Sequence, residues 1–169
     1  FQHPDPTVKR RSGFLTPYFG NSTSLGVMAE LPYYFALAPN YDFLFNPRYL
    51  SEQGVLWKGT WRHRLANGQY DVKFAALDQE RNDLAGAGFQ VEGWRGSLES
   101  RGEFSLGSFW RFGWDVTVES DDTFRRTYKL DDILQSDRVN TVYLHGLSSR
   151  NAFSIVGYHF GGLLLTDDA

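Results

Sequence analysis

The stretch LPYYFALAPNYDFLFNPRY, residues 31–49, poses the main structural question in this sequence. Its aromatic and branched apolar residues are typical of β-strands, and Pro39 in its middle suits a turn. Pro32 and Pro47, however, lie inside the two runs that would pair with each other. Because proline has no N–H, each one deletes a hydrogen bond from the ladder, so a hairpin with one in each strand requires an explanation.

The strand signature of this stretch extends along most of the chain. In VLWKGTWRHRL (55–65) and WRFGWDVTVE (110–119), apolar residues alternate with charged or polar ones. No segment of about a dozen residues keeps a helical period free of Gly and Pro. We therefore predict an all-β fold, an antiparallel up-and-down meander of about eight strands, at residues 23–37, 41–50, 54–65, 69–79, 89–106, 109–120, 138–149 and 151–165.

Three hairpin registers follow, because cross-strand partners must share a face of the sheet. A two-residue turn at Asn67-Gly68 pairs Leu65 with Tyr70. A three-residue loop at 107–109 places Trp114 over Gly102.

The third register concerns the opening hairpin. A loop at 38–40 pairs Leu37 with Tyr41 and makes Pro32 and Pro47 diagonal neighbours. The two ladder breakers are therefore expected to lie together.

Two segments fall outside this ladder. Residues 1–20 contain three prolines and the triplet Lys9-Arg10-Arg11, which predicts a linker from an upstream domain. Residues 21–169 would then form the sheet. Residues 120–138 are dense in charge and predict a solvated connection.

The composition excludes several classes of protein. A length of 169 residues suits one domain, and a start at Phe1 without a signal peptide leads us to expect a mature or cut piece of something longer. A net charge of −3 argues against nucleic-acid binding, and zero cysteines exclude disulfides and thiolate metal sites within this sequence. No apolar run reaches the ~18 residues of a membrane helix.

Alternation alone permits two architectures. In a soluble sandwich the ring-bearing faces turn inward, whereas in an outer-membrane barrel they meet lipid and the charged faces line a lumen. Strands of ten or more residues favour the barrel, where ~9–11 are needed to cross the hydrocarbon, over globular strands of ~5–6. Tyr and Trp on the apolar faces agree with interfacial belts.

Several motifs resemble the family of the LPS-assembly protein LptD, also called OstA or organic solvent tolerance protein. They are PDPTVKRRSGFL (4–15), LPYYFALAPNYD (31–42) and NPRY (46–49), followed by Gly54. WDVTVESDDTFRRTY (114–128) is similar to a strand-ending segment of the same family. The match corresponds to the N-terminal part of the family's barrel domain.

The resemblance implies a function in lipopolysaccharide (LPS) transport and insertion into the outer leaflet of the Gram-negative outer membrane. It implies LPS as substrate, a periplasmic LPS bridge acting through an N-terminal periplasmic domain absent from this chain, and an LptE-like lipoprotein plug in the lumen. Neither enzymatic activity nor a catalytic residue, metal or cofactor is implied. In this family prolines of the first two strands are thought to loosen a lateral gate, and Pro32 and Pro47 match their positions.

Within a barrel, the charged faces belong in the lumen, since a charge at mid-membrane on a lipid face costs ~2–4 kcal/mol. In a soluble sheet the same residues would instead be a solvated outer face. The residues assigned to the lumen are Arg62, Arg64, Asp71, Lys73, Glu99, Arg101, Glu103, Arg111 and Asp115.

Two alternatives remain open. One is a small self-contained barrel or sandwich that binds a ligand, which would close its sheet by pairing its first and last strands. The other is an outer-membrane lipid hydrolase that uses His145 with Ser148 or Ser149. The four histidines, which include His3, show no metal-ligand spacing.

Overall fold

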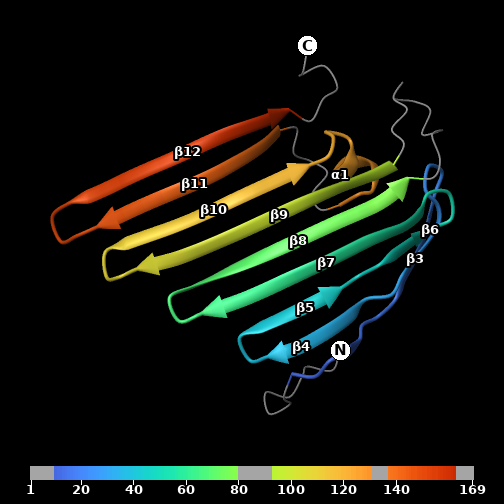
Figure 1. Ribbon diagram of the computed structural model, residues 1–169, viewed down its shortest axis with the longest axis horizontal. Helices are drawn as coiled ribbons and strands as arrows, with labels where there is room; N and C mark the ends of the chain where they lie inside the picture. The colour runs from blue at the N-terminus through green and yellow to red at the C-terminus, as the bar shows by residue number, and fades with distance from the viewer. Residues whose placement is uncertain (1–9, 80–92, 131–136, 163–169) are drawn as a thin grey trace.

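The computed structural model describes residues 10–79, 93–130 and 137–162, which form one antiparallel sheet of 12 strands with almost no helix (Figure 1). The predicted all-β meander is confirmed. His3, Lys9 and the ends of two predicted strands lie outside these residues. The strands are β1 (Gly13–Phe14), β2 (Tyr18–Ser22), β3 (Gly26–Glu30), β4 (Tyr33–Ala38), β5 (Tyr41–Phe45), β6 (Arg48–Leu50), β7 (Gly54–Leu65), β8 (Gly68–Gln79), β9 (Gly93–Leu106), β10 (Trp110–Glu119), β11 (Asp137–Leu147) and β12 (Ala152–Gly162).

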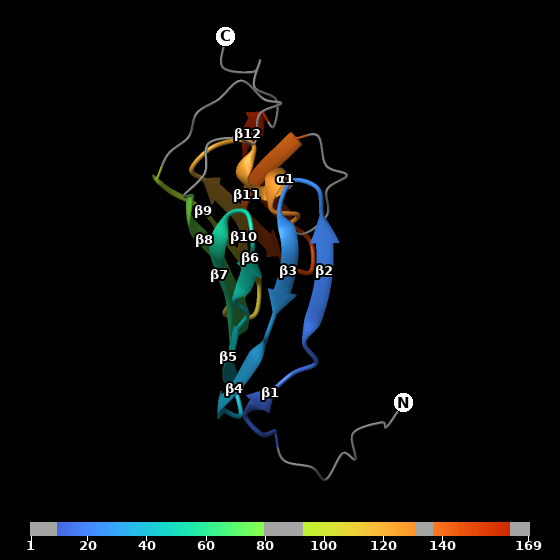
Figure 2. The same ribbon diagram turned by 90° about the vertical axis from the view of Figure 1, so that its right-hand side faces the viewer.

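The strands follow one main path with a branch at one end. The main path runs β1-β4-β5-β7-β8-β9-β10-β11-β12, and β2-β3-β6 joins it through β7. The first half of β7 pairs with β6 and its second half with β5. Figure 2 shows β2 and β3 leaning away from the edge-on main sheet.

The hairpin with the three-residue loop at 107–109 has the predicted register. Gly102 pairs with Trp114, and Phe104 pairs with Phe112. The Trp114 ring covers the glycine so closely that a Cβ on Gly102 would lie 2.4 Å from it. An aromatic ring thus covers the bare backbone of a glycine in this register.

The register predicted at Asn67-Gly68 is wrong by two residues. Leu65 pairs with Gly68 and Gly59 with Phe74, so the tight turn is Ala66-Asn67. A shift of two residues keeps every side chain on its face, which is why the alternation of faces does not reveal it. The observed register lets Phe74 cover Gly59, where a Cβ would lie 2.4 Å from the ring.

The opening hairpin differs from the prediction only near its turn. Phe35 pairs with Phe43, but Tyr41 pairs with Ala38 instead of Leu37, because the register shifts between Phe35 and Ala38. The strands predicted at 23–37 and 41–50 are each divided in two at a proline. β1 and β2 lie largely within the segment predicted as a linker.

Rings and charges occupy opposite faces of the sheet. Successive pairs align Phe74, Leu98 and Val118 across β8, β9 and β10, and their side chains are exposed. The buried core described is small and lies on the charged side, around Leu56, Leu77 and Tyr128. Among the described residues nothing packs on the apolar face, unlike on the inner face of a sandwich.

The charged segment after β10 is not a solvated connection. It forms α1 (Phe124–Thr127), which lies beside the sheet near the ends of β9 and β10 (Figures 1 and 2). Phe124 and Tyr128 are fully buried at 0% exposure, so the prediction for 120–138 is wrong there. Among the described residues, no helix is both long enough and apolar enough to cross a membrane.

Replacement of Gly102 by Val should destabilise the full-length protein by ~1–3 kcal/mol, because the side chain would have to displace Trp114. The measurement is the free energy of unfolding in denaturant. Gly157→Val is the matched control, since the nearest atom to a Cβ there is 3.8 Å away. Equal stability of the two variants would contradict the register described for β9 and β10.

Candidate functional site

Pro32 and Pro47 lie at the two points where the opening hairpin changes from one ladder to another. Pro32 separates β3 from β4, and Pro47 separates β5 from β6. Pairing keeps its register across both breaks, since Glu30 pairs with Arg48 on one side and Tyr33 with Phe45 on the other. The prolines therefore interrupt the hydrogen bonding without shifting the strands.

The hydrogen bonds around the breaks show which neighbour each proline weakens. The N–H of Leu31 donates to the carbonyl of Pro47 at 3.4 Å, and the N–H of Leu15 donates to the carbonyl of Pro32 at 2.9 Å. In an antiparallel strand the N–H and C=O of one residue point to the same side. Pro47 therefore lacks a donor toward the first strand of the hairpin, and Pro32 lacks one toward the outer edge, where residue 15 lies.

Pro17, in the segment predicted as a linker, belongs to the same feature. It separates β1 from β2 and directly precedes Tyr18, which pairs with Glu30. Pro17, Pro32 and Pro47 therefore form a proline row across three neighbouring strands. The even spacing of these prolines in the sequence was the signal that could have identified the additional strand.

The two ends of the sheet remain unjoined. β12 pairs with β11, and within the described residues it has no second partner. The outer edge of β4 is partly covered by the preceding chain: Gly13 pairs with Tyr34, and the N–H of Ala36 donates to Ser12 Oγ at 2.9 Å. Arg10 forms an ion pair with Asp42. The strands of residues 10–79, 93–130 and 137–162 therefore do not form a self-contained ring closed by the first and last of them.

The charged face contains a row of alternating signs. Consecutive pairs align Asp42, Arg62, Asp71, Arg101 and Asp115 across β5, β7, β8, β9 and β10. Arg62 lies 2.7 Å from Asp42, and Arg101 lies 2.9 Å from Asp115. Opposite charges in neighbouring positions stabilise the pairing, and they leave the face hydrophilic.

A second row places Lys73 beside Glu99 at 3.0 Å. Arg64, Glu103 and Arg111 lie on the same face, nearer the tight turns. The register thus brings all nine residues assigned to a lumen onto one face, the side on which α1 packs. That this face lines a lumen stays a prediction.

A buried arginine of β9 holds α1 against the sheet. Arg95, 4% exposed, donates from Nε and Nη2 to the two carboxylate oxygens of Asp121 at 2.8 and 2.6 Å. It also donates to Gln79 and Thr123, at 2.9 and 2.8 Å. Its guanidinium lies over the rings of Phe124 and Tyr128, 5.6 and 5.7 Å from their centroids.

Burial alone would raise the pKa of Asp121, but hydrogen bonds from Arg95 and Thr123 and the charge of Arg95 lower it from 3.8 to about 2. Because the pKa of Asp121 is lower in the folded state, ionised Asp121 stabilises that state at pH values above 3.8, its pKa in the unfolded chain. This stabilisation is lost as the pH falls through about 2. The contact should therefore persist at moderately acidic pH.

Sequence reasoning missed Arg95 because its partner Asp121 lies 26 residues away. The aromatic pair Phe124 and Tyr128, spaced four residues apart, was the signal of a buried helical turn.

His145 does not pair with Ser148 or Ser149, as the hydrolase alternative would have it. Its Nδ1 lies 3.0 Å from Ser154 Oγ, and its ring stacks on Tyr143. A catalytic histidine needs an orienting acid, and no carboxylate partner of His145 is found in the part of the chain described. Across residues 10–79, 93–130 and 137–162, no three His, Asp or Glu side chains are grouped to hold a metal ion.

Known proteins match this chain over much of its length. The sequence profile of the family described as LPS transport system D, LptD, matches residues 93–168. The LPS-assembly protein LptD of Bordetella pertussis is 34% identical over 118 residues, 70% of this chain. That of Pseudomonas entomophila is 41% identical over 75 residues, 44% of the chain. The chain spans only a small part of these relatives, 14% and 8% of their respective lengths.

Asp121→Asn should release α1, because Arg95 would then be buried without a charged partner. Hydroxyl-radical footprinting of the full-length protein should show Tyr128, fully buried here, oxidised several-fold faster. Unmodified protein should keep Tyr128 protected at pH 4, since the pKa of Asp121 is about 2. Asp122→Asn is the control, because Arg95 binds Asp121 instead. Unchanged labelling in the Asp121 variant would contradict this anchoring.

Proposed function

Because this chain belongs to the LptD family, we propose that it forms part of the wall of an outer-membrane barrel that transports LPS and inserts it into the outer leaflet. The observation that carries the proposal is the sheet itself, which exposes rings on one face and charges on the other and, as far as the structure describes it, is open at β12. Further strands of a longer protein would complete the ring. We assign residues 21–169 to the partial barrel, and residues 1–20, whose last part already contributes β1 and most of β2 to the sheet, to the entry from a periplasmic domain.

The two faces have different solvents in this proposal. The ring-bearing face meets acyl chains, where apolar side chains cost nothing to expose and Tyr and Trp suit the interfaces. The charged face, with α1 packed on it, lines the water-filled lumen, where its ion pairs are tolerated. An LptE-like lipoprotein plug would contact this lumen face, and a periplasmic bridge would deliver LPS. Transport of this kind needs no catalytic residue or cofactor, and we assign none.

Cysteine substitutions test the assignment of the faces. In the full-length protein in its membrane, Leu98→Cys should react with a lipid-soluble maleimide and resist a charged one, because Leu98 lies on the ring-bearing face. Arg101→Cys should react with the charged reagent. Reaction of both sites with the charged reagent alone would show that the ring face meets water, and would contradict the barrel.

We assign Pro32 and Pro47 to a lateral gate beside the first strand of the barrel. A hydrogen bond contributes a net ~0.5–1.5 kcal/mol, and each proline forfeits one. Pro32 forfeits a bond toward the outer edge, the side that a last strand would occupy, whereas Pro47 weakens the adjoining strand pair. Separating the strands of the first hairpin therefore costs less free energy than separating other strands of the wall. LPS acyl chains can leave the barrel sideways at this point.

Replacement of both prolines by Ala should tighten the gate, since two hydrogen bonds become available. At ~1 kcal/mol for each bond, the open population should fall about fivefold for each replacement. The measurement is the amount of newly made LPS at the cell surface in cells that depend on the full-length variant.

Pro39→Ala is the matched control, because Pro39 lies in the turn of the same hairpin and outside both ladders. Normal LPS export in the double variant, with a normal amount of folded protein, would remove the gating role from Pro32 and Pro47. The barrel assignment would survive that result, because it rests on the two faces.

A further inference from the structure

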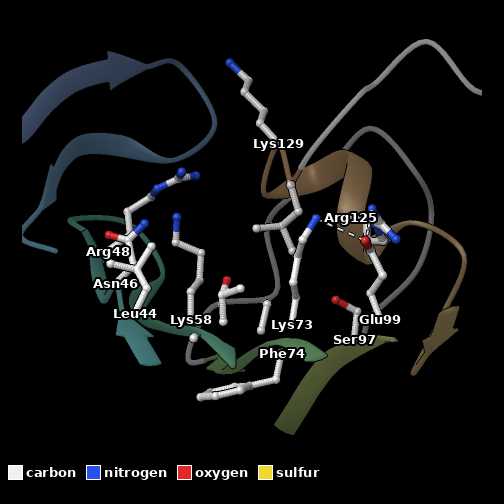
Figure 3. A pocket seen from close by; sticks show the side chains of 14 residues that line it. Leu44, Asn46, Arg48, Lys58, Lys73, Phe74, Ser97, Glu99, Arg125 and Lys129 are labelled. Carbon is white, nitrogen blue, oxygen red and sulfur yellow. Dashed lines mark hydrogen bonds and ion pairs between the residues drawn. The ribbon is translucent and has the colours of Figure 1, made fainter. Parts of the chain in front are cut away.

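A cavity of about 240 Å³ lies on the charged face, between α1 and the strands from β5 to β9 (Figure 3). Its floor is the sheet, and the residues that follow α1 form its upper wall. Phe74 contributes to the floor but points its ring away from the cavity, toward the ring-bearing face. A water molecule takes up about 30 Å³, so the cavity has room for a tetrahedral anion and part of a sugar.

Cations dominate the lining of this cavity. Five of its residues are basic and one is acidic, namely Arg48, Lys58, Lys73, Arg125, Lys129 and Glu99. Figure 3 shows Arg48 and Lys58 on one side and Lys73 and Arg125 on the other. The basic groups therefore surround the space instead of lining a single edge.

The structure holds most of these cations in place. Glu30 accepts from Arg48 at 2.6 Å and from Lys58 at 2.9 Å, and its side chain is 11% exposed. Arg48 also donates to the carbonyl of Tyr128 at 2.9 Å, which ties it to the segment after α1.

The opposite side has the same arrangement. Glu99, whose side chain is 6% exposed, lies 3.0 Å from Lys73 and 3.1 Å from Arg125. With Glu30 and Glu99 counted, the described residues here still carry more positive than negative charge. The cations are thus pre-positioned before any ligand enters.

This arrangement suits a phosphate group. A phosphate monoester carries about −1.5 to −2 charges near neutral pH and three strong acceptor oxygens, so it can bind several ammonium and guanidinium groups at once. Asn46 and Ser97 add neutral polar groups to the lining. The ammonium and guanidinium groups need not be unpaired, because a phosphate can share them with the carboxylates.

We propose that this cavity binds a phosphate group carried on a sugar, and, resting on the proposed function, that the sugar is the phosphorylated head group of LPS. Asn46 and Arg48, the two neighbours of Pro47, both line the cavity. The binding site therefore adjoins the proline row on the lumen side. A head group held there would lie beside the gate while its acyl chains pass through the opening.

The test measures LPS binding to the purified full-length protein and to its Lys58→Gln and Lys129→Gln variants. Each substitution should weaken binding of phosphorylated LPS about tenfold. The same LPS with its phosphates removed should bind weakly and equally to all three proteins. Arg150→Gln, in the turn before β12 and away from the cavity, should bind like the unmodified protein. Lys58→Arg should keep the affinity, which separates loss of charge from loss of fold.

The outcomes separate this inference from the proposed function. Equal affinity of the unmodified protein for phosphorylated and dephosphorylated LPS would overturn the phosphate site and leave LPS transport standing. Failure of both forms of LPS to bind would overturn the proposed function. Inorganic phosphate should compete only at far higher concentration than phosphorylated LPS. Competition at equal concentration would show a site for the free anion and overturn the assignment to a lipid head group.

Discussion

The separation of rings from charges on the two faces of one sheet is the constraint on which the rest of the structure depends. Side chains alternate along every strand, so one correct register carries a whole face across its neighbours. The row from Asp42 to Asp115 keeps opposite charges adjacent over five strands. Within the described residues, α1 and the cavity lie on the charged face, and the proposed barrel turns the other face toward acyl chains.

Much of this fold could be predicted from the sequence because alternation is a local signal. The strands and the faces follow from it, but a shift of two residues preserves both, so the Asn67-Gly68 register required knowledge of which ring covers which glycine. β1 and β2 were missed because the prolines around them are typical of a linker. α1 was missed because what buries it, Arg95, comes from a distant strand.

The candidate site, too, could be predicted from the sequence only in part. That Pro32 and Pro47 would be neighbours follows from the hairpin pattern and its resemblance to a known family. The strand pairing that each proline weakens does not follow from that pattern. It depends on the direction of individual carbonyl groups, such as that of Pro32, which points toward Leu15. The cavity combines residues from five strands and the segment around α1, and no spacing in the sequence would bring Arg48 and Arg125 together.

The divided pairing of β7 has a mechanical consequence. Because β6 and β5 pair with different halves of this one strand, a tilt of one against the other at Pro47 would leave intact the pairs that β7 makes with β8 from Trp57 to Leu65. Any bending at this point would therefore be concentrated in the opening hairpin, and the strands from β7 onward would keep their pairing.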